Sequence, residues 1–568
     1  MNRLGHCLVG NCSLWEIAAK NSRILWCLLS FPTQAARPMY PLINALAFLF
    51  FVYLLVAFRD YKRRRGLPYP PGPSSWPIIG NLLDVPKDTP WTVYADMSKK
   101  YGDLFCLRVF NQVVIVLCSS SAIKDLLEKR AQTCSERPTL PILEMMELDW
   151  FVPSVGMCES WREGRKILDR SLRPGAAMLY RQMMQEKTRW FLTQLFANPK
   201  EFHHHIELFQ GKLIMSLTYG YDLKDGDDFM AAPIQATEIM SRLILPGAAL
   251  VNQLPFLRHI HSWVPFLSYE RLMRMGRVLS EKLKNAPIDF VKDAMRNGTA
   301  VQSLASEHLQ GLETFVGSER QTQEEIIKKT LGSIYIGEVL YYGPNIWHLQ
   351  GLFLAGADTT VSSMYSFFLA LVLFPQVQRR AQAEIDAVIG RDRLPTFDDR
   401  PRLPYIDALC KELMRWQMVG PVGFPHSSSK DDVYRGFFIP KGSVIIANAW
   451  AILHDPETYP DPEEFKPERF LDEDGTVRDD PTLSLVFGVG KRICPGRHVV
   501  DATLFIVTSS VLSAFNVTKA RDENGNEIPV KAMATVLSGI VVHPAKFACS
   551  IVPRDKVAED LILENTVS

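Results

Sequence analysis

The pattern of apolar and charged positions divides the chain near residue 59. Residues 38–58 carry no charged side chain, and a helix of that length spans about 30 Å, the thickness of a bilayer's hydrocarbon core. A buried core helix has the same composition, but a basic cluster follows at once, as it does after a membrane span, at Arg59, Lys62, Arg63, Arg64 and Arg65. We therefore predict a single transmembrane anchor at 38–58, with the following residues in the cytosol.

The residues before this anchor do not fit the same orientation. Residues 1–37 place four cations on the side that would be translocated, namely Arg3, Lys20, Arg23 and Arg37. Met39 begins a stretch that looks like a complete anchor by itself. We therefore expect the native protein to start at Met39, with residues 1–37 an atypical leader created by the gene model.

Beyond the anchor, apolar positions repeat mainly with the period of a helix. Residues 59–81 first form a basic and proline-rich linker, because the prolines between 68 and 77 forbid a helix there. Helices are predicted at 122–131, 161–172 and 377–389, and short strands at 113–117 and 444–447. We expect one large folded domain at 82–568 that is mainly α with small β-sheets.

Composition limits the function classes without selecting one. The chain has 568 residues, enough to bury a large core, and its 47% hydrophobic and 22% charged residues are ordinary for a globular protein. The 63 Lys and Arg residues nearly balance the 62 Asp and Glu residues, so no overall field favours nucleic acid. The ten cysteines lack C-x-x-C spacing, which argues against a disulfide framework and against a structural zinc site.

One cysteine differs from the others in its surroundings. Cys494 lies in FGVGKRICPG, residues 487–496, which contains three glycines. An isolated cysteine is usually a small buried hydrophobe, but a metal-binding thiolate needs backbone amides directed at its sulfur. Gly488, Gly490 and Gly496 let the chain approach a metal without side-chain obstruction, and an apolar helical run begins near His498. The loop therefore predicts an iron-binding thiolate at Cys494.

The spacing F-G-x-G-x-R-x-C-x-G resembles the haem-binding loop of the cytochrome P-450 superfamily. The resemblance implies haem b with Cys494 as its axial ligand, in a loop that includes Gly488. It also implies that Phe487 shields the sulfur and that Arg492 pairs with a haem propionate. The implied fold is the mainly α cytochrome P-450 fold behind one N-terminal transmembrane helix, and the motifs most resemble fungal members of secondary metabolism.

A second motif, KELMR at 411–415, places Glu412 and Arg415 one turn apart on a helix. Such pairs are common on surfaces and contribute little there. The motif FKPERF at 465–470 follows downstream, and the resemblance joins its Arg469 to the first pair beneath the haem. It implies a buried charge network that holds the cysteine loop, in which loss of one member leaves an uncompensated charge.

A third motif, AGADTT at 355–360, lies inside an apolar stretch that predicts a central helix. A buried threonine commonly bonds back to a carbonyl one turn earlier, without further function. Here the small residues 355–357 leave room for dioxygen and water. The resemblance assigns Thr359 and Asp358 as the catalytic hydroxyl and carboxylate that relay protons during dioxygen cleavage.

Two weaker motifs extend the predicted haem site. WREGR at 161–165 resembles the family's W-x-x-x-R, which implies that Trp161 and Arg165 bind propionate; by itself it is an amphipathic helix start. His426 lies where the family places another propionate-binding side chain, although a single histidine is more often structural. These two motifs complete the predicted cofactor contacts.

Residues 337–354 are an unusual insertion, because the resemblance implies a central helix with 18 residues fewer at this point. As a helix they would add about five turns and about 27 Å. Gly343, Pro344 and Asn345 disfavour one continuous helix, since proline removes a hydrogen bond and clashes with the preceding turn. We expect this segment to be a retained intron.

The resemblance implies a monooxygenase at the endoplasmic reticulum membrane, single-pass and facing the cytosol. It would oxidise a lipophilic small molecule with O2 and with electrons from NADPH, delivered by NADPH-cytochrome P-450 reductase and by cytochrome b5 as a second donor. The basic residues Lys166, Arg170, Lys491 and Arg497 could meet an acidic reductase surface, or be ordinary solvated charges. Two alternatives remain, a haem-thiolate isomerase or dehydratase that needs no reductase, and a non-catalytic haem-binding protein.

Family position also predicts the substrate pocket. It draws on four segments, 139–152, 234–257, 419–424 and 537–540. Their side chains are largely apolar, which favours a lipophilic terpenoid, polyketide or aromatic compound, and they include Met145, Met146, Trp150, Phe151 and Phe424.

Overall fold

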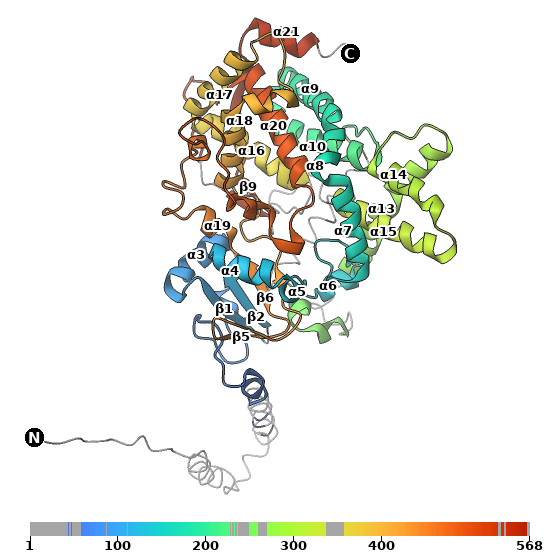
Figure 1. The fold of residues 1–568 in the computed structure, drawn as a ribbon, viewed down its shortest axis with the longest axis vertical. Helices are drawn as coiled ribbons and strands as arrows, with labels where there is room; N and C mark the ends of the chain where they lie inside the picture. The colour runs from blue at the N-terminus through green and yellow to red at the C-terminus, as the bar shows by residue number, and fades with distance from the viewer. Residues whose placement is uncertain are drawn as a thin grey trace, which may run out of the picture. The chain divides into compact units, whose positions relative to one another are not determined.

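The computed structural model describes residues 58–564, with gaps at 87, 111, 260–269, 337–356, 532–534, 539–540 and most of 228–248. The chain divides into two units, Met1–Pro68, of which few residues are described, and Tyr69–Ser568 (Figure 1). Three predicted segments lie outside the described residues: the leader 1–37, nearly all of the anchor 38–58, and the insertion 337–354. Among the described residues, no single helix has the length and hydropathy of a membrane span. The pair Thr359–Leu373 and Pro375–Val388 meets those criteria jointly but bends by 102°.

The larger unit begins inside the proline-rich segment. The amide of Cys106 donates to the carbonyl oxygen of Pro71 at 2.8 Å, and the side chain of Asn81 donates to the carbonyl oxygens of Pro73 and Ser74. Residues 69–81 therefore pack against the first strand of this unit, so that part of the predicted linker belongs to the folded domain.

A four-stranded sheet lies at one end of this unit, in the order β1-β2-β6-β3. It consists of β1 (Leu104–Val109), β2 (Gln112–Leu117), β6 (Val444–Ala447) and β3 (His426–Ser427). Both predicted strands are confirmed, and they pair in parallel with Val114 opposite Val444. Because β3 pairs with β6, it brings His426 beside Ile445 at the edge of the sheet. The two-stranded sheets are β4 (Asp432–Tyr434) with β5 (Phe437–Ile439), β7 (Phe515–Lys519) with β10 (Cys549–Pro553), and β8 (Thr535–Ser538) with β9 (Val541–Pro544).

Helices form the rest of the described unit, which confirms the mainly α prediction. They include α3 (Pro90–Tyr101), α7 (Glu159–Leu172), α9 (Arg181–Ala197), α10 (Phe202–Tyr219), α13 (Glu270–Arg296), α15 (Gly317–Ile336), α16 (Ala357–Leu373), α17 (Pro375–Val388), α18 (Pro404–Trp416) and α20 (Arg497–Ala514). The predicted helices at 161–172 and 377–389 correspond to α7 and α17. The predicted helix at 122–131 is interrupted, because α4 (Ser120–Ile123) continues into a π-helical turn at Lys124–Lys129 and then α5 (Ala131–Cys134).

Two largely buried helices form the centre of the core. Residues 360–372 of α16 and 502–514 of α20 are all buried, which explains why these two stretches carry no charged side chain. α16 contacts α10, α18, α20 and β9, and α18 contacts α20 (Figure 1).

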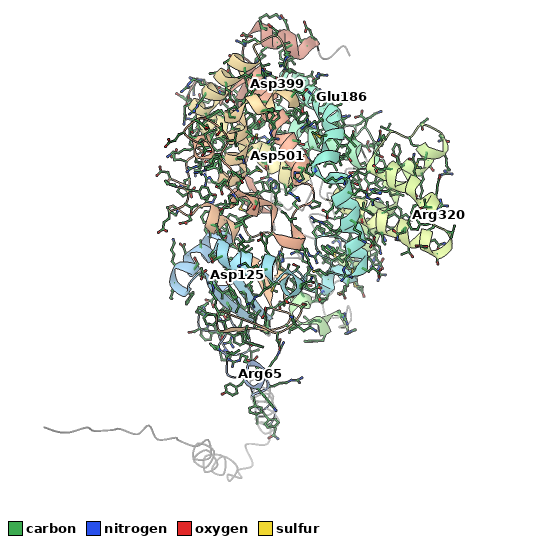
Figure 2. All side chains as sticks on the ribbon, in the orientation of Figure 1. Arg65, Asp125, Glu186, Arg320, Asp399 and Asp501 are labelled. Atoms are coloured by element: carbon green, nitrogen blue, oxygen red, sulfur yellow. The ribbon has the colours of Figure 1, made fainter. Side chains whose placement is uncertain are left out.

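The charged side chain of Arg400 links α18 to α20. Arg400 donates to Asp407 of α18 and, through both terminal nitrogens, to Asp501 of α20 at 2.6 and 2.8 Å. Figure 2 shows Asp501 on α20 in the upper half of the unit. This contact fixes the helix that follows Cys494 against the helix that carries Glu412.

Candidate cofactor site

A cavity of about 360 Å³ lies between α7, α10, α15, α16, the loop after α18, the cysteine loop and α20. Most of the predicted cofactor and catalytic residues line it, although they come from four segments far apart in the chain. These are Trp161, Arg165, Thr359, His426, Phe487, Gly488, Arg492 and Cys494. The fold therefore brings together the residues that the separate motifs predicted.

The cysteine loop folds back on itself before α20 begins. The amide of Cys494 donates to the carbonyl oxygen of Phe487 at 2.8 Å, and Gly488 turns the chain with a φ of 74°. Gly490 has a φ of 58°, and a Cβ added there would lie 2.3 Å from the carbonyl oxygen of Leu127. Glycine is therefore required at 490 both for the backbone conformation and for close packing on the π-helical turn.

The sulfur of Cys494 lies at the amino-terminal end of α20. Burial raises the pKa of the Cys494 thiol, and this effect is opposed by hydrogen bonds from the amides of Gly496 and Arg497 and by the charges of Arg165 and Arg497. The surroundings thus favour negative charge on a sulfur that burial alone would keep protonated. A metal ion bound to the sulfur would stabilise the thiolate further.

Among the described residues, no group of three or more His, Cys, Asp or Glu side chains could hold a metal ion. The family resemblance implies that an iron at Cys494 would be held by a porphyrin as well.

Arg492 has two guanidinium nitrogens that lack a partner. Its Nε donates to the carbonyl oxygen of Ser135 at 2.9 Å, and the guanidinium lies 4.2 Å from the centre of the Trp161 ring. Nη1 and Nη2 are buried without a hydrogen-bond acceptor among the described residues. Burial lowers the pKa of Arg492 to about 10, which Arg165 reinforces and Glu136 opposes. An anionic group at the cavity edge would satisfy both nitrogens.

The other predicted anion-binding side chains are held by backbone carbonyls. Arg165 donates to the carbonyl oxygen of Ile493 at 2.6 Å and pairs with Asp169 at 2.9 Å, so it also braces the cysteine loop. Nδ1 of His426 lies 3.1 Å from the carbonyl oxygen of Cys134. Burial and the charges of Arg137 and Arg492 hold the pKa of His426 well below its usual range.

Arg137 is a cavity-lining residue that no motif pointed to. Its Nε donates to the carbonyl oxygen of Pro153 at 2.7 Å, and its Nη1 donates to those of Phe424 and Pro425 at 2.9 and 2.7 Å. Burial and the nearby charge of Arg492 lower its pKa. Because its recorded partners are backbone oxygens, the sequence carries no signature of these contacts.

The predicted proton-relay residues begin α16. Thr359 lines the cavity, and its carbonyl oxygen accepts from Ser363 Oγ at 3.1 Å. The side chain of Asp358 lies outside the described part of the structure. Thr360 also lines the cavity, and its Oγ1 is buried without a partner in the part of the chain that the structure describes. Two adjacent threonines therefore line the cavity where the motif singled out one.

Glu412, Arg415 and Arg469 form a connected charge network beside the cavity. Arg415 donates through Nε and Nη2 to the two carboxylate oxygens of Glu412, at 2.7 and 2.9 Å. Arg469 donates to Glu412 at 3.1 Å, and the amide of Lys466 donates to it at 2.9 Å. Glu412 and Arg415 are 0% exposed. The remaining guanidinium nitrogens bind carbonyl oxygens of 453, 460, 461, 462 and 464, so the network fixes the segment that precedes the cysteine loop.

The predicted substrate pocket is reproduced only in part. Val152, Val419 and Phe424 line the cavity, together with Val541 of β9. Trp150 does not line it, because its Nε1 donates to Ser280 Oγ of α13 at 2.8 Å inside the core. Met146 is likewise fully buried, against Gly276 of the same helix. Most of 234–248, and the side chains of 537–540, lie outside the described residues.

A second hollow of about 560 Å³ opens to the surface beside α7 and the cysteine loop. Five cations line it with one carboxylate, Asp169. The cations are Arg162, Arg165, Arg173, Lys491 and Arg497. Of the four residues predicted to meet a partner, Lys491 and Arg497 line this hollow, whereas Lys166 and Arg170 lie on α7 outside its lining.

Comparison with known proteins agrees with this geometry. The family model described as Cytochrome P-450 matches residues 70–548. The cytochrome P-450 monooxygenase COX1 of Coprinopsis cinerea is 37% identical over 516 residues, covering 89% of this chain and 95% of the relative. The cytochrome P-450 monooxygenase claR of Ampulloclitocybe clavipes is 36% identical, covering 90% of each chain. Tryptamine 4-monooxygenase of Psilocybe cyanescens is 33% identical, covering 88% and 96%.

Proposed function

Because the chain belongs to the cytochrome P-450 family of monooxygenases, we propose that it oxidises a lipophilic small molecule with O2 and electrons that a reductase transfers from NADPH. One observation carries this proposal: a thiol at a helix amino terminus shares a cavity with a guanidinium whose two terminal nitrogens are buried without a partner among the described residues. We also propose that residues 38–58 anchor the enzyme in the endoplasmic reticulum membrane, on the strength of their apolar sequence and basic flank.

The residues present fit haem b. Cys494 would ligate the iron through its sulfur, and the two terminal nitrogens of Arg492, whose guanidinium lies over the Trp161 ring, would bind a propionate. Arg165, His426 and Arg137 would be the further side chains that hold the propionates, and a bound carboxylate would oppose the lowering of the His426 pKa. When bound, haem supplies the iron chemistry that reduces dioxygen and oxidises the substrate.

The chain's own contribution is to deliver protons and to exclude bulk water. Thr359 lies at the cavity surface, where its hydroxyl can pass a proton to the oxygen site, and Asp358 next to it would supply the proton. Val152, Phe424 and Val541 line the cavity with apolar surface, which favours a lipophilic substrate over water.

Replacing Thr359 with alanine is expected to uncouple the reaction. Without the hydroxyl, NADPH consumption continues while product formed per NADPH falls by about 10²-fold, the lower end of what a positioned proton-transfer group contributes. Thr359→Ser keeps a hydroxyl and should retain most of the coupling. Reconstitution with a reductase, measuring NADPH consumed and product formed, tests this. Normal coupling in Thr359→Ala would show that the Thr359 hydroxyl does not relay protons.

The cationic hollow beside the cysteine loop is the surface we assign to the reductase. Because like charges repel, Lys491→Glu is expected to slow association with the reductase by about 10-fold at low salt, with the difference shrinking as salt is added. Lys441→Glu makes the same charge change at an exposed turn outside the hollow and serves as the control. Stopped-flow electron transfer at several ionic strengths measures this. Equal rates for the two variants would place the docking surface elsewhere.

Isotope labelling tests the proposed reaction as a whole. The enzyme, expressed in a host with a fungal reductase under ¹⁸O2, should produce metabolites that contain one labelled oxygen atom. An isomerase or a dehydratase would give products without label, and a non-catalytic haem protein would give no new products.

A further inference from the structure

The outer edge of β9 is held by contacts with two other walls of the cavity. In the β8–β9 hairpin, Val542 is paired with Leu537. The amide of Val542 donates to the carbonyl oxygen of Val419 at 2.8 Å, and its carbonyl oxygen accepts from Ser362 Oγ at 2.5 Å. Antiparallel strands alternate residues whose backbone groups face the partner strand with residues whose groups face away. Val542 is of the second kind, so its backbone can bind other elements.

These contacts join three parts of the cavity at one residue. Val541 and Val419 both line the cavity, on β9 and on the loop after α18. Ser362 belongs to α16, three residues after Thr359, and its side chain is 1% exposed. Within the packing of α16 against β9, the Ser362 hydroxyl therefore adds a hydrogen bond between the helix at the predicted oxygen site and the strand that carries Val541.

Loss of the Ser362 hydroxyl is expected to change the position of β9, because β9 belongs to a two-stranded hairpin. A two-stranded hairpin has little stability by itself, so outside contacts set its position. The carbonyl oxygen of Val542 is buried, and without the hydroxyl it would lose its recorded partner at a cost comparable to a lost hydrogen bond. α16 is buried along residues 360–372 and provides a fixed reference for the strand.

We propose that Ser362 is a positioning residue for substrate selectivity, because it fixes the wall formed by Val541 and Val419 at a set distance from α16. The proposal rests on the proposed function only in taking this cavity as the substrate site. Ser362 itself does not line the cavity, so its effect on bound molecules would be exerted through β9.

Two variants of the holoenzyme separate this role from a general effect on α16. Ser362→Ala removes the hydroxyl that reaches β9. Ser366→Ala removes an equally buried hydroxyl one turn later, whose bond stays inside the helix, to the carbonyl oxygen of Ser362 at 2.8 Å. Hydrogen exchange of peptides covering 541–544 is expected to rise by about five-fold or more in Ser362→Ala, the equivalent of one neutral hydrogen bond, and to stay unchanged in Ser366→Ala.

Ligand size provides the second readout. Imidazole and 4-phenylimidazole offer the same ring nitrogen to a haem iron, but the phenyl group of 4-phenylimidazole would bring it closer to the apolar wall of the cavity. We expect Ser362→Ala to change the dissociation constant of 4-phenylimidazole by about five-fold and that of imidazole by less than about two-fold. Wild-type exchange and an unchanged ratio of the two constants in Ser362→Ala would overturn the proposal. So would an equal effect from Ser366→Ala.

A third variant covers the case in which the alanine protein does not fold. Ser362→Cys fills a similar space with a much weaker donor, and it should show both changes in the same direction. Wild-type behaviour of the cysteine variant would count against the proposal. The exchange measurement requires no turnover, so it remains decisive even if the proposed reaction proves wrong.

Discussion

Replacing Glu412 with glutamine is expected to lower the free energy of unfolding by about 3–5 kcal/mol, the range for a broken buried ion pair. Glu412 accepts hydrogen bonds from Arg415, Arg469 and the amide of Lys466. Glutamine keeps the size of the side chain but removes the charge, which leaves two guanidinium groups uncompensated. Chemical unfolding of the holoenzyme, followed by circular dichroism and by haem absorbance, measures the change.

A neighbouring glutamate provides the control. Glu468 lies next to Arg469 in the FKPERF segment, but its side chain is 46% exposed and pairs with Arg380 at the surface. Exposed pairs contribute little, so Glu468→Gln should have a much smaller effect on unfolding. If Glu412→Gln were as stable as Glu468→Gln, the buried network would not hold the segment before the cysteine loop.

Replacing Cys494 with serine is expected to reduce product formation by about 10³-fold or more, as loss of a principal catalytic group does. A serine hydroxyl stays protonated and lacks the electron-rich sulfur that assists dioxygen cleavage. Part of the haem should remain bound, because Arg492 and Trp161 contact the cavity independently of residue 494. Product formation per bound haem is the quantity to measure.

Cys158→Ser is the matched control for this change, because Cys158 is an exposed cysteine at the start of α7. Its activity should equal that of the wild type. Substantial turnover by Cys494→Ser at normal haem content would show that the thiol is not the ligand that supports catalysis.

The sequence predicted those parts of the site in which the functional residues lie close together in the chain, at a fixed spacing. The glycines around Cys494 are needed for a sharp turn, and the spacing of Glu412 and Arg415 is that of one helical turn. Each of these patterns can be recognised in a stretch of ten residues or fewer. The family resemblance then related the separate stretches to one another.

The parts that the sequence did not predict depend on contacts between distant segments. Arg137 binds carbonyl oxygens of residues 153, 424 and 425, and any residue type could supply those oxygens. Trp150 was expected in the pocket for its apolar ring, but its indole N–H finds a buried acceptor on α13 instead. The helix expected at 122–131 contains a π-helical turn, and Gly490 packs against this turn. The contact joins segments far apart in the chain, so the local pattern of apolar residues does not indicate it.

The most direct test of a haem–thiolate site is the carbon monoxide difference spectrum of the reduced wild-type protein, recorded beside that of Cys494→Ser. We predict that the wild type shows the long-wavelength absorption band typical of thiolate ligation, and that the serine variant lacks it. A wild-type protein without this band, or a variant that keeps it, would contradict the assignment of Cys494 as the iron ligand.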